Sequence, residues 1–473
     1  MKELVLITGN FNVLHPGHQR LFRYAKTLAK KLCVAVASNK IAGPNAYYDE
    51  ALRLEGIKNN VLVDDAFLMV GPVEDLIYSL TPDFVLKGSE HDGKYNPEQL
   101  ALEETGGKLI FHSGMGYVDN AAPRSGFSVW KNKISLITPA SYIERHGVQK
   151  KVLKGILRKI QNKKVLILGD LIIDEYVDCE TLGISQEDAN PVYRKINSKK
   201  YIGGAGIVAC HASKIGASVT FLSLSGSDDS RKFALAELSS ANVSAFIVED
   251  QSRPTSLKKR YRIAGHSRVR ISELTSQPMM SSLENIICEK ILALKEKPEL
   301  IIFSDFSYGF LTKRLVKFVE SYADHNKIPI AADSQSSSQV GNILKFKNTI
   351  LSTPTETEAR MGLRNQDDGL VALSESLRKR VNARHLLLKL GAEGVLVHTK
   401  QGCTVVTDQI PALNYNVKDT SGAGDALLSI SALALMVGAS IWEAALLGSI
   451  GAAIQVGREG NIPIHFDEIM ELV

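Results

Sequence analysis

The chain has 473 residues and a formal net charge of +5; 44% of its residues are hydrophobic and 23% are charged. This length exceeds what one ordinary core covers, so we expect two or three domains with the composition of a globular protein. The mild positive charge suits small anionic substrates, and without a long basic run it does not favour nucleic-acid binding. The five cysteines are scattered without zinc-site spacing, which predicts a cytoplasmic, reducing setting with neither disulfides nor structural metal.

The first elements of the chain place two histidines at the start of a helix. Residues 2–8 predict a strand, residues 9–12 predict a turn, and Pro16 suits the first position of a helix. His15 and His18 therefore flank a helix N-terminus that follows a strand. Two imidazoles and the unpaired N–H groups of a helix start can stabilise a phosphoryl group during its transfer.

This spacing resembles the G-x-F-D-x-x-H-x-G-H signature of the cytidylyltransferase-like nucleotidyltransferases. Residues 32–39 resemble that family's second strand and turn, and residues 82–88 resemble its PD-x-L-x-KG strand end. The resemblance implies that His15 and His18 stabilise the transition state at the α-phosphate of a nucleotide. Further nucleotide contacts are implied for Gly9, Phe11, Asn12, Lys87 and Ser125, with Arg53 also near the phosphates or the sugar phosphate.

Two positions depart from that signature. Asn12 stands where the family usually has Asp, and an amide brings no charge to a metal or an amine. The family's late Ser/Thr-rich helix start is represented only by residues 124–128, which include Ser125 but lack the central Thr. Whether this first domain turns over a substrate therefore stays open.

Residues 131–163 have the pattern of a basic, partly helical connector. Between residues 148 and 164, Lys and Arg alternate with apolar residues at the spacing of an amphipathic helix. Such a stretch can lie on a membrane surface or against a partner helix, or it can be a connector with a solvated basic face. Of these alternatives, we expect a connector whose basic face is solvated.

A second strand-and-turn opening follows at residues 164–170. Two such openings on one chain favour two independent α/β domains over one long domain. In the second domain, Gly203 and Gly204 precede a predicted helix at residues 207–214. Glycines at this place allow a ligand to approach the backbone closely.

Residues 255–273 alternate in polarity and are rich in cations, among them Arg262. Gly265 and His266 predict the turn of a hairpin. The cations can keep an exposed ribbon soluble, or the ribbon can close as a lid over an anionic substrate. Both interpretations can hold together.

The stretch DTSGAGD at residues 419–425 predicts a turn that opens a helix. Gly422 and Gly424 can adopt backbone angles that a Cβ forbids, and the unpaired N–H groups of a helix start bind anions. Asp425 then lies where a carboxylate could accept a proton from a hydroxyl that attacks a phosphate. Taken alone, the stretch equally fits an ordinary glycine-rich helix entry.

Residues 426–456 contain a single charge, Glu443, and are long enough to span a membrane. Gly438 interrupts the run, and Ser440 with Glu443 fits a capping box at the start of a new helix. We therefore expect two buried helices and no membrane span.

Residues 164–473 resemble the ribokinase-like (PfkB) sugar kinases along almost their whole length. The matching segments are Gly203–Gly204, the turn at residues 389–394 and the DTSGAGD stretch, in the family's order. The resemblance implies Asp425 as the general base, Gly422, Ala423 and Gly424 as the anion hole, Asp174, Gly203, Gly204 and Arg262 at the sugar, and Lys389, Gly391 and Thr420 at the nucleotide. It also implies that Glu358 helps to hold Mg²⁺, with ATP as the co-substrate.

Within this family, the closest resemblance is to the heptose-phosphate kinase branch. Residues 169–176, 184–187 and 353–354 carry it. That kinase is typically joined to a cytidylyltransferase-like domain in a bifunctional chain that makes ADP-heptose for lipopolysaccharide, and here the two domains stand in reversed order. Gln335 and Tyr308 stand where the branch tends to have Lys, which favours weaker sugar-phosphate binding or a different substrate.

Together these patterns predict an α/β protein with a Rossmann-like nucleotidyltransferase domain (1–130), the connector (131–163) and a ribokinase-like α/β/α domain with a small β lid (164–473). The expected function is two-step sugar-nucleotide synthesis from a sugar or sugar phosphate and nucleoside triphosphates, and the resemblance allows a homodimer through the lid. Two alternatives stay open: a plain sugar kinase with an inactive first domain, or a first domain that binds a nucleotide as a sensor.

Overall fold

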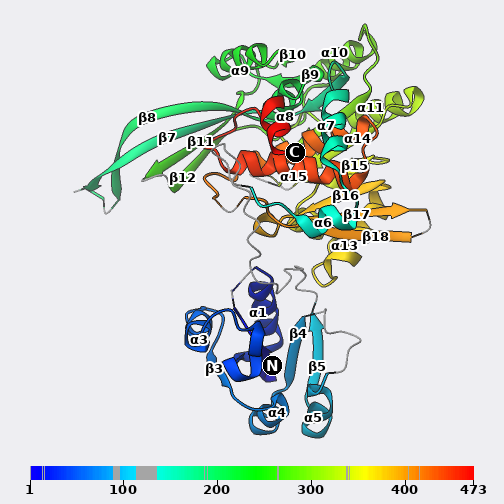
Figure 1. Ribbon diagram of the computed structural model, residues 1–473. Helices are drawn as coiled ribbons and strands as arrows, with labels where there is room; N and C mark the ends of the chain where they lie inside the picture. Colours follow the sequence, from blue (N-terminus) through cyan, green and yellow to red (C-terminus); the bar gives the residue numbers. More distant parts are fainter. Residues whose placement is uncertain are drawn as a thin grey trace. The chain divides into compact units, whose positions relative to one another are not determined.

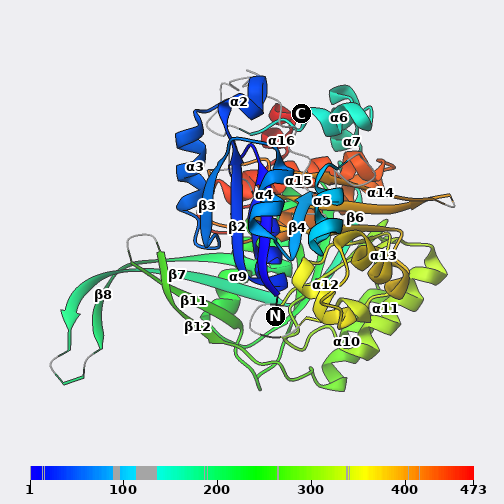
Figure 2. The ribbon, with the colours of Figure 1, turned by 90° about the horizontal axis from the view of Figure 1, so that it is seen from below.

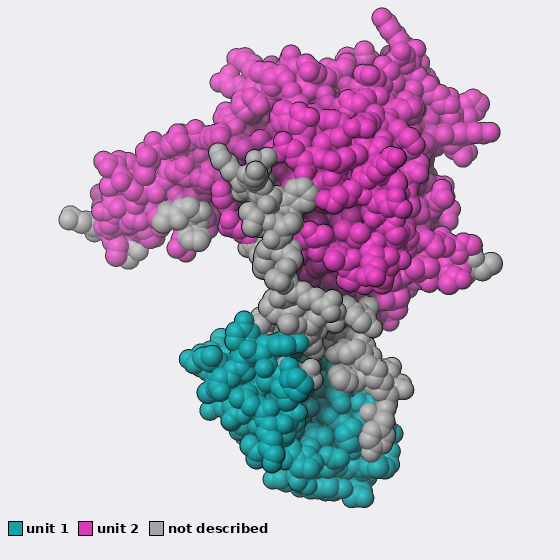
Figure 3. Space-filling view, in the orientation of Figure 1, with its two compact units in different colours: residues 1–128 teal, residues 129–473 magenta. Residues whose placement is uncertain are grey.

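The computed structural model describes residues 2–12, 14, 16–88, 96–112, 136–185, 187–188, 190–263, 266–336, 339, 341–402, 404–414 and 416–473. The chain divides into two compact units, unit 1 (Met1–Ser128) and unit 2 (Val129–Val473), which Figure 3 shows in different colours. The domain limits predicted at residues 130 and 163 stay predictions.

The described residues of unit 1 form a five-stranded parallel sheet with helices. The strands are β1 (Lys2–Gly9), β2 (Ala29–Ala37), β3 (Asp65–Met69), β4 (Phe84–Gly88) and β5 (Lys108–His112). The helices are α1 (Pro16–Leu28), α2 (Asn39–Ala42), α3 (Glu50–Lys58), α4 (Val73–Leu80) and α5 (Glu98–Thr105). The strand order β3-β2-β1-β4-β5 confirms the predicted Rossmann-like fold.

Successive side chains of β1 enter two different cores. Val5 and Ile7 pack with residues of α1 and α3 on one face of the sheet, while Leu6 packs with residues of α4 and α5 on the other. Because strand side chains alternate between faces, a strand covered on both sides must be apolar throughout. This explains why residues 4–7 are an unbroken apolar run.

The described residues of unit 2 form a nine-stranded main sheet in the order β10-β9-β6-β13-β14-β15-β16-β17-β18. The strands are β6 (Lys164–Gly169), β9 (Ser218–Ser225), β10 (Ser244–Glu249), β13 (Leu300–Asp305), β14 (Ile330–Ser334), β15 (Leu351–Ser352), β16 (His385–Lys389), β17 (Val395–Gln401) and β18 (Thr404–Ile410). The pairs from β10 to β16 are parallel, whereas β17 and β18 are antiparallel additions.

Helices cover both faces of the main sheet (Figure 1). One face packs against α6 (Ala140–Arg145), α7 (Lys150–Lys159), α8 (Ala205–Lys214), α9 (Asp229–Ser240), α14 (Ala423–Met436), α15 (Ile441–Val456) and α16 (Phe466–Leu472). The other face packs against α10 (Ser281–Leu292), α11 (Lys313–Asn326), α12 (Glu356–Leu363) and α13 (Leu370–Val381). This is the predicted α/β/α layering.

A second, four-stranded sheet in the described part of unit 2 forms the lid. Its strands are β7 (Leu171–Ile184), β8 (Pro191–Gly204), β11 (Ser256–Ile263) and β12 (His266–Glu273), in the order β12-β11-β7-β8. These strands extend away from the layered body of unit 2 in both ribbon views (Figure 1 and Figure 2). The hairpin predicted at residues 255–273 is the antiparallel pair β11–β12.

The stretch predicted as a basic connector contributes to the core of unit 2. Leu153, Leu157 and Ile160, on and just after α7, are buried in the same cluster as residues of α15 and α16. The Lys and Arg residues of α7 leave its other side polar, as the amphipathic pattern predicts. Part of the predicted connector is therefore built into unit 2.

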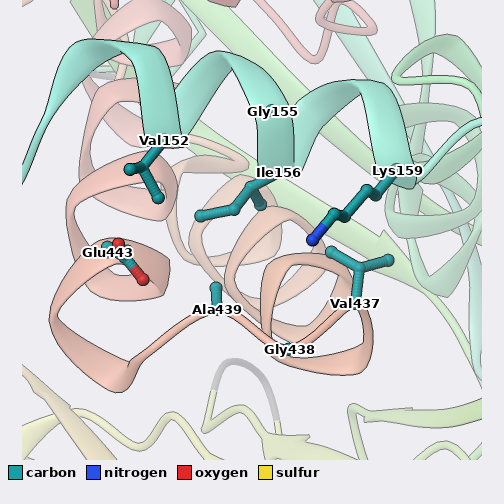
Figure 4. A pocket seen from close by; sticks show the side chains of 8 residues that line it. All are labelled: Val152, Gly155, Ile156, Lys159, Val437, Gly438, Ala439 and Glu443. Carbon is teal, nitrogen blue, oxygen red and sulfur yellow. The ribbon is translucent and has the colours of Figure 1, made fainter.

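A surface hollow of about 200 Å³ lies between α7 and the turn from α14 to α15 (Figure 4). Val152, Ile156 and Val437 give it apolar walls, and a Cβ added to Gly155 or Gly438 would meet nothing within 4 Å. None of the predicted site residues lines this hollow, so its position does not favour it as the catalytic pocket.

The long apolar run at the end of the chain is two helices, as predicted. Ser440 and Glu443 form a capping box at the start of α15, and no helix in the described part of the chain is long and apolar enough to cross a membrane. The two helices pack closely because α15 presents small residues: a Cβ on Gly448 would lie 2.0 Å from Ser431 Oγ and 2.9 Å from the carbonyl oxygen of Leu427.

Replacing Gly448 with Ala should therefore lower the free energy of unfolding of unit 2 by about 1–3 kcal/mol, because the added methyl group overpacks the interface. Gly155→Ala is the matched control, since its Cβ enters open space and Ala is the better helix former; it should stabilise by up to about 1 kcal/mol. Equilibrium unfolding in urea measures both. Equal effects of the two substitutions would contradict the close packing of α14 against α15.

Candidate active site

Polar side chains gather where the strands of the main sheet of unit 2 end. β6 and β13 are neighbours, but the next strands of the main sheet, β9 and β14, lie on opposite sides of this pair. The carboxyl ends of β6 and β13 therefore form a switch point of the kind that binds ligands. The start of α14 reaches the same edge. Asp425 contacts Gln335, which follows β14, and Gly424 lies against Lys389, the last residue of β16.

The DTSGAGD stretch forms the predicted helix start. Gly422 has φ of 75° and caps α14, which begins at Ala423, and Asp425 lies in the first turn. A Cβ on Gly422 would lie 2.4 Å from Asn461 Oδ1, and one on Gly424 would lie 3.2 Å from Lys389 Nζ. Gly422 therefore needs glycine both for its φ and for space, whereas a Cβ on Gly424 would press on the Lys389 side chain. The N–H groups of a helix start suit an anion.

The first carboxylate of the stretch, Asp419, holds the turn together. It accepts hydrogen bonds from the backbone N–H of Ser421 (2.9 Å), the backbone N–H of Gly460 (3.0 Å) and the hydroxyl of Tyr176. Gln455 adds two more contacts by donating to the carbonyl oxygens of Ser421 and Gly460. The turn is thus fixed from three directions before any ligand binds.

Asp425 is a buried carboxylate in a negative environment. Its Oδ1 accepts a hydrogen bond of 2.6 Å from the Gln335 amide. Burial, with the carboxylate of Asp333 nearby, raises the pKa of Asp425 to about 7, against the opposing effect of Lys389. Such a group can take up and release a proton near neutral pH, as a general base must.

Lys389 and Asp333 form a buried ion pair beside Asp425, with Lys389 Nζ 2.7 Å from Asp333 Oδ2. Burial alone would lower the pKa of Lys389, but Asp333 and Glu358 raise it, so the side chain stays a cation. Asp333 has a pKa raised to about 6, chiefly by its burial. The carboxylate of Asp333 therefore holds Lys389, the predicted nucleotide residue, beside Gly424 of the DTSGAGD stretch.

The predicted magnesium residue Glu358 belongs to the start of α12. Its two oxygens accept from the backbone N–H groups of Ser336 and Thr355, the second contact being part of a capping box. Asp333 Oδ1 is buried and has no hydrogen-bond partner among the described residues. Carboxylate oxygens are what Mg²⁺ prefers, so this orphaned oxygen fits the ion, although the described residues contain no cluster of three metal-ligating side chains.

Three of the predicted sugar residues, Asp174, Gly203 and Gly204, lie close together, and Asn461 connects Asp174 to Gly422 of the DTSGAGD stretch. Asp174 is buried on β7 and its Oδ2 accepts a hydrogen bond of 3.1 Å from the Asn461 amide. A Cβ on Gly203 would lie 2.4 Å from the same oxygen, and one on Gly204 would meet the carbonyl oxygen of Asp170. Burial raises the pKa of Asp174, while Arg260 counteracts it. The site thus brings Asp174, Gly203 and Gly204 together.

Arg262 is already engaged by two carboxylates. It donates to Asp178 at 2.6 Å and to Glu459 at 2.9 Å, and its guanidinium lies 4.9 Å from the ring centroid of Tyr176. A substrate that binds Arg262 would have to compete with both carboxylates. The role of Arg262 at the sugar stays a prediction. Thr420 and Gly391 are exposed to solvent, and their predicted contacts with the nucleotide also stay predictions.

Tyr308, which stands at one of the two lysine positions of the related branch, is buried. Its hydroxyl has no hydrogen-bond partner among the described residues. Tyr308 lines a small cavity of about 10 Å³ together with Asp170 and Arg253. Cations still border this position, because Arg253 lines the cavity and Lys258 Nζ lies 5.2 Å from the centroid of the Tyr308 ring.

Unit 1 has its own switch point between β1 and β4. Gly9 ends β1, and Phe11 follows with φ of 48°. The ring of Phe11 lies 5.1 Å from that of His18 on α1, and a Cβ on Gly9 would lie 3.2 Å from the Phe11 ring. The turn therefore places His18 beside the strand end, while His15 and Ser125 lie outside the described residues.

The predicted cations of unit 1 have partners within the unit. Lys87, in β4, forms an ion pair of 2.8 Å with the buried Glu98. Arg53 donates to backbone carbonyl oxygens that include those of Asn10 and Ala37, at 2.7 and 2.8 Å. Arg53 thus ties the first turn to the end of β2, and its placement near phosphates stays a prediction.

Asn12 also has an internal contact, because its Oδ1 accepts from the backbone N–H of Tyr47 at 2.9 Å. An Asp at this position could make the same contact. Asn12, although it departs from the family signature, therefore still links its own turn to the backbone at Tyr47.

Two residues of the site carry no role from the sequence. Asp333 is the last but one residue of β14. Ligands bind at the carboxyl ends of parallel strands, so a carboxylate at this place in the sequence could have been identified as a site residue. Asn461 follows α15 in a loop without a recognisable pattern. Only the fold brings its amide to Asp174 and Gly422.

Comparison with known proteins supports the two-part organisation. Residues 162–466 match the model of the pfkB family carbohydrate kinases, and residues 6–103 match the cytidylyltransferase-like model. The Bifunctional protein HldE of Bradyrhizobium diazoefficiens is 29% identical over 323 residues, covering 67% of this chain and 64% of the relative. That of Pelobacter propionicus is 29% identical over 330 residues, covering 69% and 66%. The chain thus spans just under two thirds of these curated relatives.

Solved structures share the fold of unit 2. The phosphofructokinase-2 of Escherichia coli, in complex with substrates and products, gives a TM-score of 0.53 at 17% identity, over 66% of this chain and 97% of that one. The ribokinase of Arabidopsis thaliana, complexed with ribose and ATP, gives 0.52 at 17% identity, over 66% and 99%. Identities this low establish the fold alone. Since the pfkB model covers more than half of the residues, the chain belongs to the pfkB family of carbohydrate kinases and carries a cytidylyltransferase-like domain ahead of the kinase domain.

Proposed function

We propose that unit 2 phosphorylates a sugar or sugar phosphate with ATP and that Asp425 is the general base. The observation that carries this proposal is the buried carboxylate of Asp425 in the first turn of α14, next to Asp174 and the glycines of the turn. A base, an anion site and a sugar-binding carboxylate within one strand-end region are what phosphoryl transfer to a hydroxyl requires.

In this reaction an acceptor hydroxyl is held by Asp174 and directed at Asp425. The hydroxyl oxygen forms a bond to the γ-phosphorus of ATP while the bond from that phosphorus to the bridging oxygen breaks, and ADP leaves with the electron pair. Asp425 takes the hydroxyl proton. The N–H groups of the turn at Gly422, Ala423 and Gly424 donate to the phosphoryl oxygens, where negative charge accumulates.

Asp333 and Glu358 are the residues that would hold Mg²⁺ with ATP, and the ion would supply charge neutralisation at the phosphates. The ion pair of Asp333 with Lys389 keeps a cation beside the same region. Lys389 can thereby act near the phosphates without leaving its carboxylate.

For unit 1 we propose nucleotidyl transfer, in which a sugar 1-phosphate oxygen attacks the α-phosphorus of a nucleoside triphosphate and pyrophosphate leaves. The position of His18 at the switch point of a Rossmann-like sheet supports this proposal. Together with the resemblance to the heptose-phosphate kinase branch, it favours a bifunctional enzyme for a sugar nucleotide such as ADP-heptose. A substrate that already carries a phosphate would need a separate phosphatase between the two steps.

A second candidate for unit 1 is a nucleotide sensor that regulates the kinase. The internal contacts of Asn12 and Lys87 favour this candidate, because the side chains expected to meet the nucleotide already have partners. A sensor requires binding but no turnover.

The lid supports a further proposal, a homodimer through its outer sheet. Leu182, Ile184 and Ile196 are exposed by 58%, 73% and 64% on β7 and β8. Exposed apolar residues grouped on one sheet are typical of a surface that another chain covers.

Asp425→Asn should lower the kcat of sugar-dependent ADP formation by about 10²–10⁴-fold, because the amide cannot accept the proton. A coupled assay of the full chain with a panel of sugars and sugar phosphates measures this loss, and an unchanged melting temperature shows that folding is intact. Near wild-type turnover by this variant would refute the assignment of the base.

With the kinase silenced by Asp425→Asn, the full chain should release pyrophosphate from a sugar 1-phosphate and either ATP or CTP if unit 1 is a transferase. His18→Ala in the same background should abolish that release, because the imidazole no longer stabilises the phosphoryl centre. Calorimetric binding of a nucleotide without pyrophosphate release by any sugar 1-phosphate would favour the sensor instead.

Replacing Ile184 and Ile196 with Lys should shift a lid-mediated dimer to monomers, because the added charges would be buried at the interface. Sedimentation velocity measures the change, and Val61→Lys on unit 1, at an apolar residue that is even more exposed, is the control. A wild-type chain that sediments as a monomer at micromolar concentration rules out the dimer.

A further inference from the structure

Gln335 lies beside Asp425, and the sequence assigned it no role beyond the absence of a lysine. It is the first residue after β14, and its Nε2 lies 2.6 Å from Asp425 Oδ1. A carboxylate only accepts hydrogen bonds, so the amide must present its N–H group to Asp425. The contact therefore occupies one of the two oxygens of the base and leaves Oδ2 for the acceptor hydroxyl.

The position of Gln335 is itself fixed by the neighbouring backbone. Its N–H donates to the carbonyl oxygen of Asp305 at 2.8 Å, and the next residue, Ser336, donates to Glu358 at 2.8 Å. These bonds tie the segment after β14 to β13 on one side and to α12 on the other. Because the backbone at Gln335 is fixed in this way, the side chain starts from a defined position when it orients the carboxylate.

In the described part of the site, the neutral group that donates a hydrogen bond to the Asp425 carboxylate is the Gln335 amide. The groups that face it from the surrounding elements are the carboxylates of Asp333 on β14 and Asp174 on β7 and the ammonium of Lys389 on β16. Both carboxylates disfavour the negative charge of Asp425, and the Lys389 ammonium forms an ion pair with Asp333. The Gln335 amide thus contributes a direct hydrogen bond without adding a charge.

We propose that Gln335 is a positioning residue for phosphoryl transfer: its amide holds Oδ1 of Asp425 so that Oδ2 faces the acceptor hydroxyl and stays ready to take its proton. This inference rests on the kinase activity proposed above. Because the amide is neutral, the carboxylate keeps its full charge for the proton that it must accept, whereas a lysine at the same position would compete with that proton.

The proposal gives opposite outcomes for two substitutions. The hydrogen bond of 2.6 Å from Gln335 to Oδ1 stabilises the charged form of Asp425 and so lowers its pKa. The base works in its deprotonated form, so the rate falls as the pH drops below the pKa of Asp425. Gln335→Met removes the donor at similar length, so the acid limb of the kcat profile should move to higher pH. Gln335→Lys adds a cation and should move it to lower pH by about 1 unit.

The experiment records kcat and KM of the full chain between pH 5.5 and 9 for wild type, Gln335→Met, Gln335→Lys and the control Gln401→Met, at the exposed last residue of β17. Opposite shifts of the two acid limbs, with the control at the wild-type position and the sugar KM little changed, support the proposal. A residue that only fills space would lower the rate or the melting temperature without moving the limb.

Acid limbs that coincide with wild type, or that move in the same direction in both variants, overturn the role of Gln335. Melting temperatures separate loss of folding from loss of positioning, and either folded variant suffices to detect a limb at the wild-type position. If wild type itself transfers no phosphoryl group to any sugar in the panel, the proposed kinase activity fails first. The two failures are therefore distinguishable.

Discussion

The phosphoryl transfer proposed for unit 2 depends on one buried carboxylate, that of Asp425 in the first turn of α14. Burying a charge is costly unless neighbouring groups compensate for it, and here the helix N-terminus, the Gln335 amide and the Lys389 ammonium all lie close. Compensation is incomplete, so the pKa rises toward neutrality instead of falling. That incomplete balance makes the group a usable base and explains why several strand ends must converge on one helix start.

The same strand-end edge contains more carboxylates than an anionic substrate would tolerate if they were unpaired. Asp305 pairs with Lys345 at 2.6 Å, Asp333 pairs with Lys389, and Asp170 accepts backbone N–H groups, including that of Phe306 at 2.8 Å. Pairing cancels most of the long-range repulsion while it fixes the geometry. The lysines at this edge therefore neutralise carboxylates, and in the proposed reaction the helix N–H groups bind the phosphates.

Much of the fold could be predicted from the sequence because buried strands such as β6 and β13 contain apolar runs and the turn at the start of α14 contains glycines. The layering, the lid hairpin and the break between α14 and α15 all followed from such local patterns. The side-chain partners did not, because they join distant segments: Asn461 meets Asp174 across 287 positions, and Gln335 meets Asp425 across 90. The predicted roles of Arg262 and Arg53 also ignored the groups that these side chains contact within the fold.

Both units place a glycine-containing turn and a helix start at the switch point of a parallel sheet, yet they differ in the charges that remain there. In unit 2 the glycines expose helix N–H groups beside a buried base. In unit 1, Lys87 is paired with Glu98 and Arg53 is bonded to backbone oxygens. In the nucleotidyl transfer proposed for unit 1, these two cations are therefore already engaged within the unit. The proposed reaction would then depend on His18 and on the turn that places Phe11 against it.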